Sequence, residues 1–253
     1  MSRMNRRRKA VQRKVLRLKP LLNRLLQGVA VLAVSGLLLA GGWWLNQALS
    51  VHSWQISGVA EPLEIAVEKQ LNAMKPLDFL HAWPSRLRRQ LLDNVPDLAD
   101  VNIARKLPDR LLIQATPRLP VALWQGAAGE VLLVDGHGEA YRALLAGEML
   151  DLPLLRVARE EIQESVVLLL LLKQKDMARY ANLSEWLAAP DGWRLNFERG
   201  RCWLLPRGVD AMPRMRDVLV LMQEKRWQSG DWRIDARAAT RWFIRKSKLG
   251  GMV

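Results

Sequence analysis

The longest apolar run of the chain extends over residues 25–45 and contains no charged side chain. These 21 residues would rise by about 31 Å in a helix, which matches a hydrocarbon core of roughly 30 Å. Trp43 and Trp44 stand at the end of the run, and tryptophan rings favour the headgroup level. A cleaved signal peptide would have an apolar stretch of only about 7 to 15 residues before a small-residue site. The pattern therefore predicts an uncleaved transmembrane helix over 25–45.

Small residues within this run raise the question of whether the span packs against another helix. Gly36 and Ala40 form a small-xxx-small pair, which is one of the patterns that bring two transmembrane helices together. Small residues are common in membrane spans in any case. We therefore expect the helix to act mainly as an anchor, held in the bilayer by Leu25, Gly36, Ala40, Trp43 and Trp44.

Two kinds of periodicity follow one another over residues 51–119. Residues 51–59 alternate between polar and apolar positions and end near a glycine, which is typical of a strand. Pro62 and Pro84 each open a stretch with apolar residues at helical spacing. Residues 98–107 and 111–115 alternate again, with the turn signal Pro108-Asp109 between them. The order strand, helix, helix, strand, strand predicts two helices that cover one face of a three-stranded sheet.

Residues 120–253 mix shorter strand patterns with helical ones. Strands are predicted at 121–124, 131–134, 140–142, 193–198 and 202–205, with a hairpin turn over 135–138. Helical patterns cover about 160–180 and 212–227, and the apolar run in the first is too short to span a bilayer. Residues 232–236 and 242–244 make the last strand or pair of strands. The predicted fold class is α+β, with the span, the small domain and then a mixed β domain with flanking helices over 120–253.

The charge of the chain is concentrated before the span. Ten of the 39 basic residues and no acid lie in residues 1–24, and the first acid of the chain is Glu61. With those ten set aside, 29 basic and 25 acidic residues remain, so the formal charge of +14 is a local property and does not indicate a nucleic-acid-binding fold. Basic residues flank the cytoplasmic end of membrane spans. This bias predicts a cytoplasmic tail over 1–24 and a C-terminus on the far side of the membrane.

The residues show no pattern that is typical of catalysis or of metal binding. The three histidines (His52, His81 and His137) lack paired ligand spacing, and no nucleophile motif or phosphate-binding glycine loop occurs. Asp135 lies in the predicted hairpin turn, where aspartate serves the turn itself. The single cysteine, Cys202, excludes an internal disulfide and is predicted to be a small apolar residue in a strand. We expect no catalytic, cofactor or metal site, which favours a binding protein.

Several short motifs follow one another along the chain. They are Val95-Pro96, Val101-Asn102-Ile103, Leu107-Pro108-Asp109-Arg110-Leu111, Pro120-Val121-Ala122-Leu123-Trp124, Leu133-Val134-Asp135 with Gly138, Leu152-Pro153-Leu154-Leu155, Trp193-Arg194-Leu195 with Gly200, and Ile234-Asp235-Ala236-Arg237. In this order they resemble the FtsQ/DivIB family of bacterial cell-division proteins over nearly the whole chain. That family joins a membrane-proximal POTRA domain, here expected over 51–119, to a β domain. Some positions depart from the family's pattern, among them Asp97, Leu107, Pro117 and Val157, as does the tail at Ala238 and Arg241.

The resemblance implies a scaffold of the division machinery in the bacterial inner membrane, with its C-terminus in the periplasm at the septum. Its last strand and the preceding helix would capture FtsB, which pairs with FtsL, and so connect to FtsW–FtsI, which synthesises septal peptidoglycan. Arg237 would sit at the edge of that strand, with Thr240 and Trp242 farther along it. An edge strand offers unpaired backbone groups that a partner segment can satisfy by strand addition. The expected partner-binding residues are Ile234, Asp235, Arg237, Ala238, Thr240, Trp242 and Ile244.

Two other classes of protein compete with this interpretation. A POTRA-bearing transport or outer-membrane assembly factor would need a C-terminal barrel of many amphipathic strands of about ten residues. Only about 130 residues follow Trp124, and two helical patterns occupy part of them. An anchored periplasmic enzyme would need a convergent polar site, which the sequence does not display. A deep polar pocket in the structure would favour the enzyme.

Overall fold

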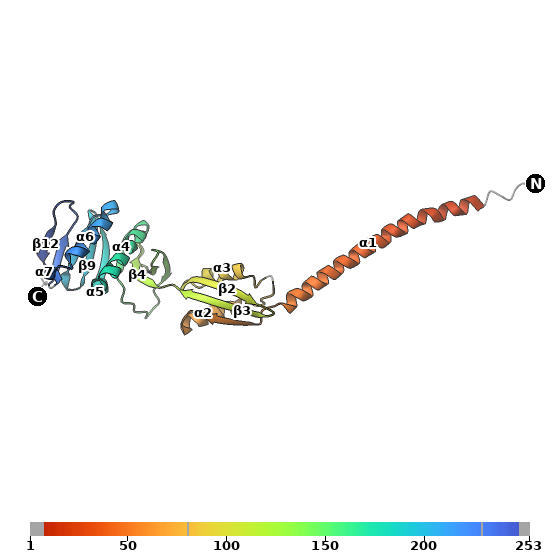
Figure 1. Ribbon diagram of the computed structural model, residues 1–253, viewed down its shortest axis with the longest axis horizontal. Helices are drawn as coiled ribbons and strands as arrows, with labels where there is room; N and C mark the ends of the chain where they lie inside the picture. Colours follow the sequence, from red (N-terminus) through yellow and green to blue (C-terminus); the bar gives the residue numbers. More distant parts are fainter. Residues whose placement is uncertain (1–7, 80, 229, 248–253) are drawn as a thin grey trace, which may run out of the picture. The chain divides into compact units, whose positions relative to one another are not determined.

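The computed structural model describes residues 8–79, 81–228 and 230–247 (Figure 1). Arg3, Arg6 and Arg7 of the predicted basic tail lie outside the described residues, as does the end of the predicted β domain after Ser247. The chain divides into two compact units, which are described separately below. The first unit comprises Met1–Ser57, Glu64–Leu91 and Val101–Gln114, and the second comprises Gly58–Leu63, Leu92–Asp100 and Ala115–Val253.

The first helix, α1 (Arg8–Ala48), contains the predicted span and also part of the predicted tail. Its segment Leu22–Ala48 is long and apolar enough to cross a membrane, and none of that segment is buried inside the protein. The five residues predicted to anchor the chain all expose their side chains or, for Gly36, an open helix face. Exposed apolar side chains on a helix of this length fit a single membrane span. The helix begins well before residue 25, which the apolar pattern alone did not indicate.

A three-stranded sheet with two helices follows α1. The elements are β1 (Ser53–Ser57), α2 (Glu61–Ala73), α3 (Pro84–Asn94), β2 (Leu98–Lys106) and β3 (Arg110–Pro117), in the spatial order β1-β3-β2. β1 runs parallel to β3. Buried and exposed residues alternate along β3, and the helices bury Val67, Leu71, Leu87 and Leu91. The predicted order strand, helix, helix, strand, strand is confirmed.

The rest of the chain forms a nine-stranded mixed sheet with helices. The spatial order of the strands is β12-β11-β10-β9-β8-β7-β4-β5-β6. Parallel pairs (β4 with β7, β7 with β8, β10 with β11) occur among antiparallel ones. The strands are β4 (Pro120–Gln125), β5 (Val131–Asp135), β6 (Ala140–Ala143), β7 (Leu154–Arg156), β8 (Leu183–Ala189), β9 (Gly192–Phe197), β10 (Cys202–Leu205), β11 (Trp232–Asp235) and β12 (Phe243–Lys246), and the helices are α4 (Ile162–Lys175), α5 (Met177–Ala181), α6 (Ala211–Leu221) and α7 (Lys225–Gln228).

One face of this sheet carries most of its buried side chains. Trp193, Leu195 and Phe197 of β9 are buried, whereas Arg194 between them is exposed. The buried side chains form one core with apolar residues of α4 and α6, such as Leu169 and Val218. Alternation of this kind shows that helices cover a single face of the strands. The predicted α+β class, with a mixed β domain and flanking helices, is confirmed.

The two long helices predicted in this part are each shorter than expected. Asp176 ends α4 with non-helical backbone angles (φ −151°, ψ 81°), and its carboxylate accepts a hydrogen bond at 3.0 Å from the Arg179 amide at the start of α5. A side chain that caps a new helix offers the backbone an alternative to continuing the old one. The helix predicted over 212–227 is likewise divided, into α6 and α7.

Candidate partner-binding edge

The strand β12 stands last in the sheet, and no described residue pairs with its outer side. It runs antiparallel to β11, with Ile234 opposite Ile244 and Arg233 opposite Arg245. The Ser247 amide donates a hydrogen bond of 2.6 Å to the Asp231 carbonyl, one position beyond the last pair of this register. Hydrogen-bonded and non-bonded pairs alternate in antiparallel ladders. The backbone N–H and C=O groups of Ile244 and Lys246 therefore point outward, away from β11.

The two faces of this strand pair differ in character. Ile234 is fully buried, and Ile244, opposite it, packs against the same core. On the opposite face, the pairing of four neighbouring strands places four side chains in one row. They are Phe243, Asp235, Leu204 and Arg194. Phe243 is 66% exposed although it is a large aromatic side chain. An apolar side chain thus flanks the open edge on the face opposite the core, which no helix of the described residues covers.

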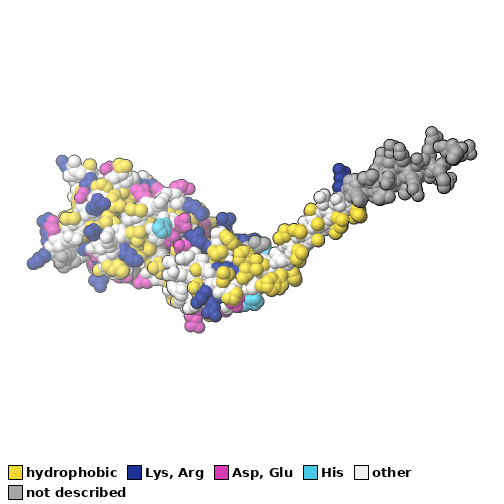
Figure 2. All heavy atoms as spheres, turned by 45° about the vertical axis from the view of Figure 1, so that its right-hand side comes forward, with side chains coloured by type: hydrophobic (Ala, Val, Ile, Leu, Met, Phe, Trp, Pro, Cys, Tyr) yellow, Lys and Arg dark blue, Asp and Glu magenta, His cyan; other side chains and the backbone are white. Residues whose placement is uncertain are grey.

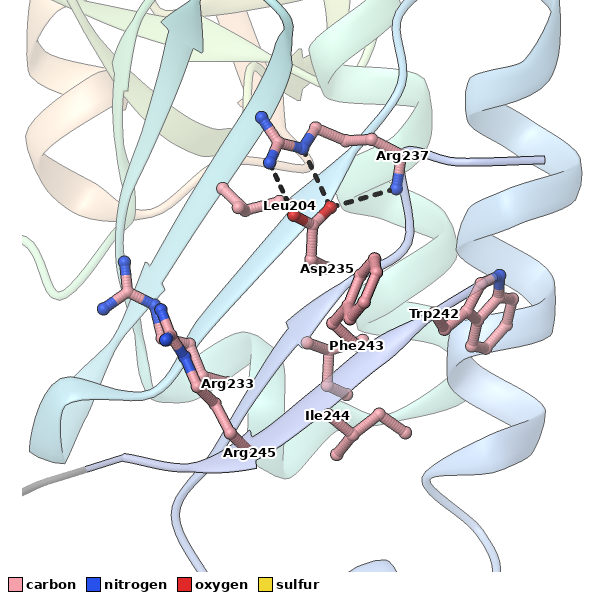
Figure 3. A pocket seen from close by; sticks show the side chains of 9 residues that line it. Leu204, Arg233, Asp235, Arg237, Trp242, Phe243, Ile244 and Arg245 are labelled. Atoms are coloured by element: carbon pink, nitrogen blue, oxygen red, sulfur yellow. Dashed lines mark hydrogen bonds and ion pairs between the residues drawn. The ribbon is translucent and has the colours of Figure 1, made fainter. Parts of the chain in front are cut away.

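A groove of about 600 Å³ opens on this uncovered face (Figure 3). Arg233 and Arg245 line it side by side, from directly opposed positions on the two strands. Like charges in opposed positions are unfavourable in a sheet. No ion-pair partner of either guanidinium is found in the described part of the chain. The edge therefore presents two unneutralised cations beside Phe243.

Arg237, the arginine expected to meet a partner, already has partners in its own chain. Its Nε donates to Asp235 Oδ1 at 2.8 Å (Figure 3). Another guanidinium nitrogen donates to the Asp191 carboxylate. Its amide also donates to Asp235 Oδ1 at 3.3 Å. Because two carboxylates neutralise this guanidinium, its first role is to hold the chain in place after β11.

Of the two alternatives expected at this end, a last strand or a pair of strands, the structure has the pair β11 and β12. Residues 236–242 connect β11 to β12 through a bend, so the prediction that Thr240 and Trp242 lie farther along the strand of Arg237 is wrong. Arg214 of α6 explains the bend in part, because it donates to the Ala239 carbonyl at 3.2 Å and lies over the Trp242 ring. Thr240 is exposed in this connection.

The seven residues predicted to bind a partner therefore fall into three groups. Ile244 belongs to β12 itself, and its backbone faces outward. Ile234 and Asp235 belong to β11, where Ile234 is fully buried and cannot touch a partner. The connection between the strands contains Arg237, Ala238, Thr240 and Trp242. Sequence reasoning missed Arg233 and Arg245, although the alternation along both strands places them on the face opposite the isoleucines.

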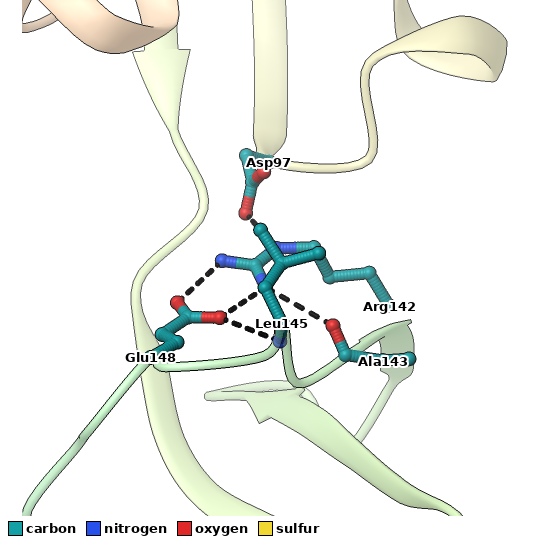
Figure 4. Close-up of polar contacts among 5 residues, drawn as sticks. All are labelled: Asp97, Arg142, Ala143, Leu145 and Glu148. Atoms are coloured by element: carbon teal, nitrogen blue, oxygen red, sulfur yellow. Dashed lines mark hydrogen bonds and ion pairs between the residues drawn. The ribbon is translucent and has the colours of Figure 1, made fainter.

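A second polar arrangement lies elsewhere in the second unit, around Arg142 of β6 (Figure 4). Its guanidinium bonds to Asp97 at 2.7 Å and to both carboxylate oxygens of Glu148 at 2.8 Å. The Arg142 side chain is only 19% exposed. Glu148 also accepts the Leu145 amide at 3.0 Å. These bonds tie the loop after β6 and the residue before β2 to one cation, an arrangement that serves structure.

Acid is expected to weaken this arrangement. The hydrogen bonds from Arg142, with that of the Leu145 amide, lower the pKa of Glu148 from 4.5 to about 2. Glu148 therefore stabilises the folded state fully above pH 4.5, and the stabilisation is lost as the pH falls toward 2. Glu148→Gln lacks this titration. We expect the difference in Tm between the native protein and Glu148→Gln to shrink between pH 5 and pH 2, as measured by circular dichroism. An unchanged difference would contradict the assignment.

The residues that could have formed a metal or catalytic site have structural surroundings instead. Among the described residues, no three His, Cys, Asp or Glu side chains gather as a metal site would require. Asp135 serves its own turn, where one carboxylate oxygen accepts the amides of His137 and Glu139 at 2.9 and 3.0 Å. Cys202 is buried in β10, and burial raises the pKa of its thiol. The prediction that Cys202 is a small buried strand residue is confirmed.

Comparison with known proteins supports the resemblance seen in the sequence. No protein-family model matches the chain. A cell division protein FtsQ of Myxococcus fulvus is 26% identical over 139 residues, which make up 51% of this chain and 48% of that protein. FtsQ of Anaeromyxobacter sp. is 29% identical over 135 residues (51% of this chain and 44% of that protein). FtsQ of Koribacter versatilis is 28% identical over 120 residues (44% and 34%).

These three matches confirm that the chain resembles the FtsQ family. Each aligned region covers less than half of the relative's own length and about half of this chain. The α+β fold with its apolar N-terminal helix is consistent with that family.

Proposed function

We propose that this relative of the FtsQ proteins is a single-span scaffold of the bacterial division machinery and captures a partner segment at strand β12. The partner is FtsB, paired with FtsL and through them linked to FtsW–FtsI and to septal peptidoglycan synthesis. The scaffold lies in the inner membrane, with its N-terminus in the cytoplasm and the nine-stranded sheet in the periplasm. It works by binding and carries out no reaction of its own.

The open edge of β12 is the observation that carries this proposal. Outward N–H and C=O groups at Ile244 and Lys246 can continue the sheet with one more strand. Native proteins protect long bare edges by charges, bulges or coverage. β12 is short and carries two cations, so in isolation it resists pairing with copies of itself. A partner strand with suitably placed carboxylates would overcome that protection.

Charge selects the partner in this arrangement. Arg233 and Arg245 repel one another across the strand pair, and an acidic side chain of the partner would neutralise both. Phe243 beside them offers an apolar surface for a neighbouring side chain. We therefore expect the captured segment to be a strand that places at least one carboxylate opposite the groove.

Reversing the charge of Arg245 should weaken partner capture. In a pull-down of the purified FtsB–FtsL pair by the full-length protein in detergent, Arg245→Glu should reduce the binding free energy by about 1.5 to 3 kcal/mol, as for other charge-assisted hydrogen bonds. Arg194→Glu is the matched control, because Arg194 is exposed on the same face of the sheet but in β9. Normal binding by Arg245→Glu, or an equal loss in Arg194→Glu, would contradict the role of the groove.

A further inference from the structure

The chain passes from α1 into the first unit almost without a linker. α1 ends at Ala48, and the Val51 amide already donates to the Leu77 carbonyl at 2.8 Å. The His52 amide donates to the Asp109 carbonyl at 2.9 Å. Three extended residues reach about 10 Å at most. The loop around Leu77 and the turn around Asp109 therefore lie close to the point where α1 ends.

Arg105 fastens this end of the unit to the chain leaving α1. Its guanidinium donates to the Leu49 carbonyl and, at 3.3 Å, to the Phe79 carbonyl. It also lies over the Phe79 ring, 4.6 Å from the centroid. Phe79 in turn packs edge-on against Trp83 at a centroid distance of 6.3 Å. The contacts form one continuous path from the end of the span to Trp83.

Two large apolar side chains at this end are exposed to solvent. Trp83 is 54% exposed just before α3, and Leu107 is 66% exposed in the turn between β2 and β3. Figure 2 shows hydrophobic side chains gathered on the surface of the first unit near the end of α1. Large exposed apolar side chains that lie together mark a surface with a partner. Here the nearest possible partner is the bilayer that holds α1.

The charges around these side chains fit a lipid headgroup layer without a strong preference for anionic lipid. Lys106 adjoins Leu107, and Asp109 follows two residues later. Asp78 in the loop pairs with His81 at 2.7 Å. Cations and anions are thus mixed, as in a zwitterionic headgroup region, and tryptophan is the side chain that favours this depth.

We propose that this end of the first unit docks on the membrane surface that α1 enters, with Trp83 and Leu107 among the lipid headgroups. The proposal rests on the single span of the proposed function and does not involve the β12 edge. Docking would set the height of the first unit above the bilayer, because two anchored side chains and the three-residue link act together.

A spin label at Leu107 tests the docking in the intact protein. The label is attached to Leu107→Cys in a Cys202→Ala background, with the full-length chain in nanodiscs of phosphatidylcholine. Collisions with oxygen, which enters lipid, are compared with collisions with a water-soluble nickel chelate. Ile65→Cys is the matched control, because Ile65 is 57% exposed in the first turns of α2, and β1 leads away from the membrane to reach that helix. Leu38→Cys within the span gives the value for lipid.

We expect a several-fold lower chelate accessibility at Leu107 than at Ile65, with oxygen accessibility between those of Ile65 and Leu38. Adding Trp83→Glu should restore chelate access at Leu107, because a carboxylate disfavours insertion among headgroups. Equal chelate access at Leu107 and Ile65 would overturn the docking while leaving the span intact. A water-exposed Leu38 would overturn both the docking and the single span, and neither result bears on partner capture at β12.

Discussion

Ile244→Pro is expected to abolish capture of the partner segment while the nine-stranded sheet stays folded. The Ile244 amide points outward from β12, so proline removes a donor that a partner strand would use and none that β11 uses. Proline is tolerated on an edge strand where its nitrogen faces solvent. A partner strand that pairs with the outer side of β12, in contrast, loses one backbone hydrogen bond, and the proline ring would clash with it. The measurement is the pull-down of FtsB–FtsL by the full-length variant.

Two controls separate the backbone from the side chain. Ile244→Ala also removes packing against the core but keeps the outward amide, so it should retain most of the binding that proline abolishes. Thr240→Pro places the same ring in the exposed connection between β11 and β12 and should bind normally. Circular dichroism establishes that each variant is folded. If folded Ile244→Pro bound as well as Ile244→Ala, the partner would not add a strand to β12.

Trp186→Ala is expected to destabilise the folded protein strongly, because it removes a large side chain from the core of the second unit. Trp186 is fully buried in β8, and its ring packs against that of Trp193 at a centroid distance of 6.1 Å. Removing a buried tryptophan costs its transfer free energy and leaves a cavity, together about 3 to 5 kcal/mol. The midpoint of urea unfolding of the full-length protein in detergent should fall accordingly.

An exposed aromatic residue of the same sheet provides the comparison. Phe243→Ala truncates a side chain that is 66% exposed, and surface truncations change the free energy of unfolding by about 0.5 kcal/mol or less. A loss in Trp186→Ala no larger than that in Phe243→Ala would show that β8 is not part of the core.

Hydrophobic periodicity determined the elements that have one regular face. The apolar span, the alternation of β2 and β3, and the order of the first five elements after α1 all follow from local sequence. Each of these segments is long enough for its period to appear, and each turns one face to a single environment.

The strands β7 and β8 were not predicted, although both lie near the middle of the sheet. β7 has only three residues, too few to display a period. In β8 the register shifts between Leu183 and Glu185, so Leu183 and Trp186 are both buried although they lie three positions apart. A bulge of this kind breaks the alternation on which recognition of a strand depends.

Part of the candidate site at β11 and β12 could likewise be predicted from the sequence, and part could not. The sequence by itself determined that a final strand-forming segment follows the last helical pattern. It also placed Asp235 and Arg237 near the middle of that segment. Only the tertiary structure decided that the segment folds into two strands, in part because Arg214 of α6 contacts Ala239 and Trp242 in the connection between them. It also decided that Arg237 is neutralised by Asp235 and Asp191, while no ion pair of Arg233 or Arg245 occurs among the described residues. Local sequence sets which way a side chain points along a strand, but the pairing of strands and the approach of residues distant in sequence decide which charges are left for a partner.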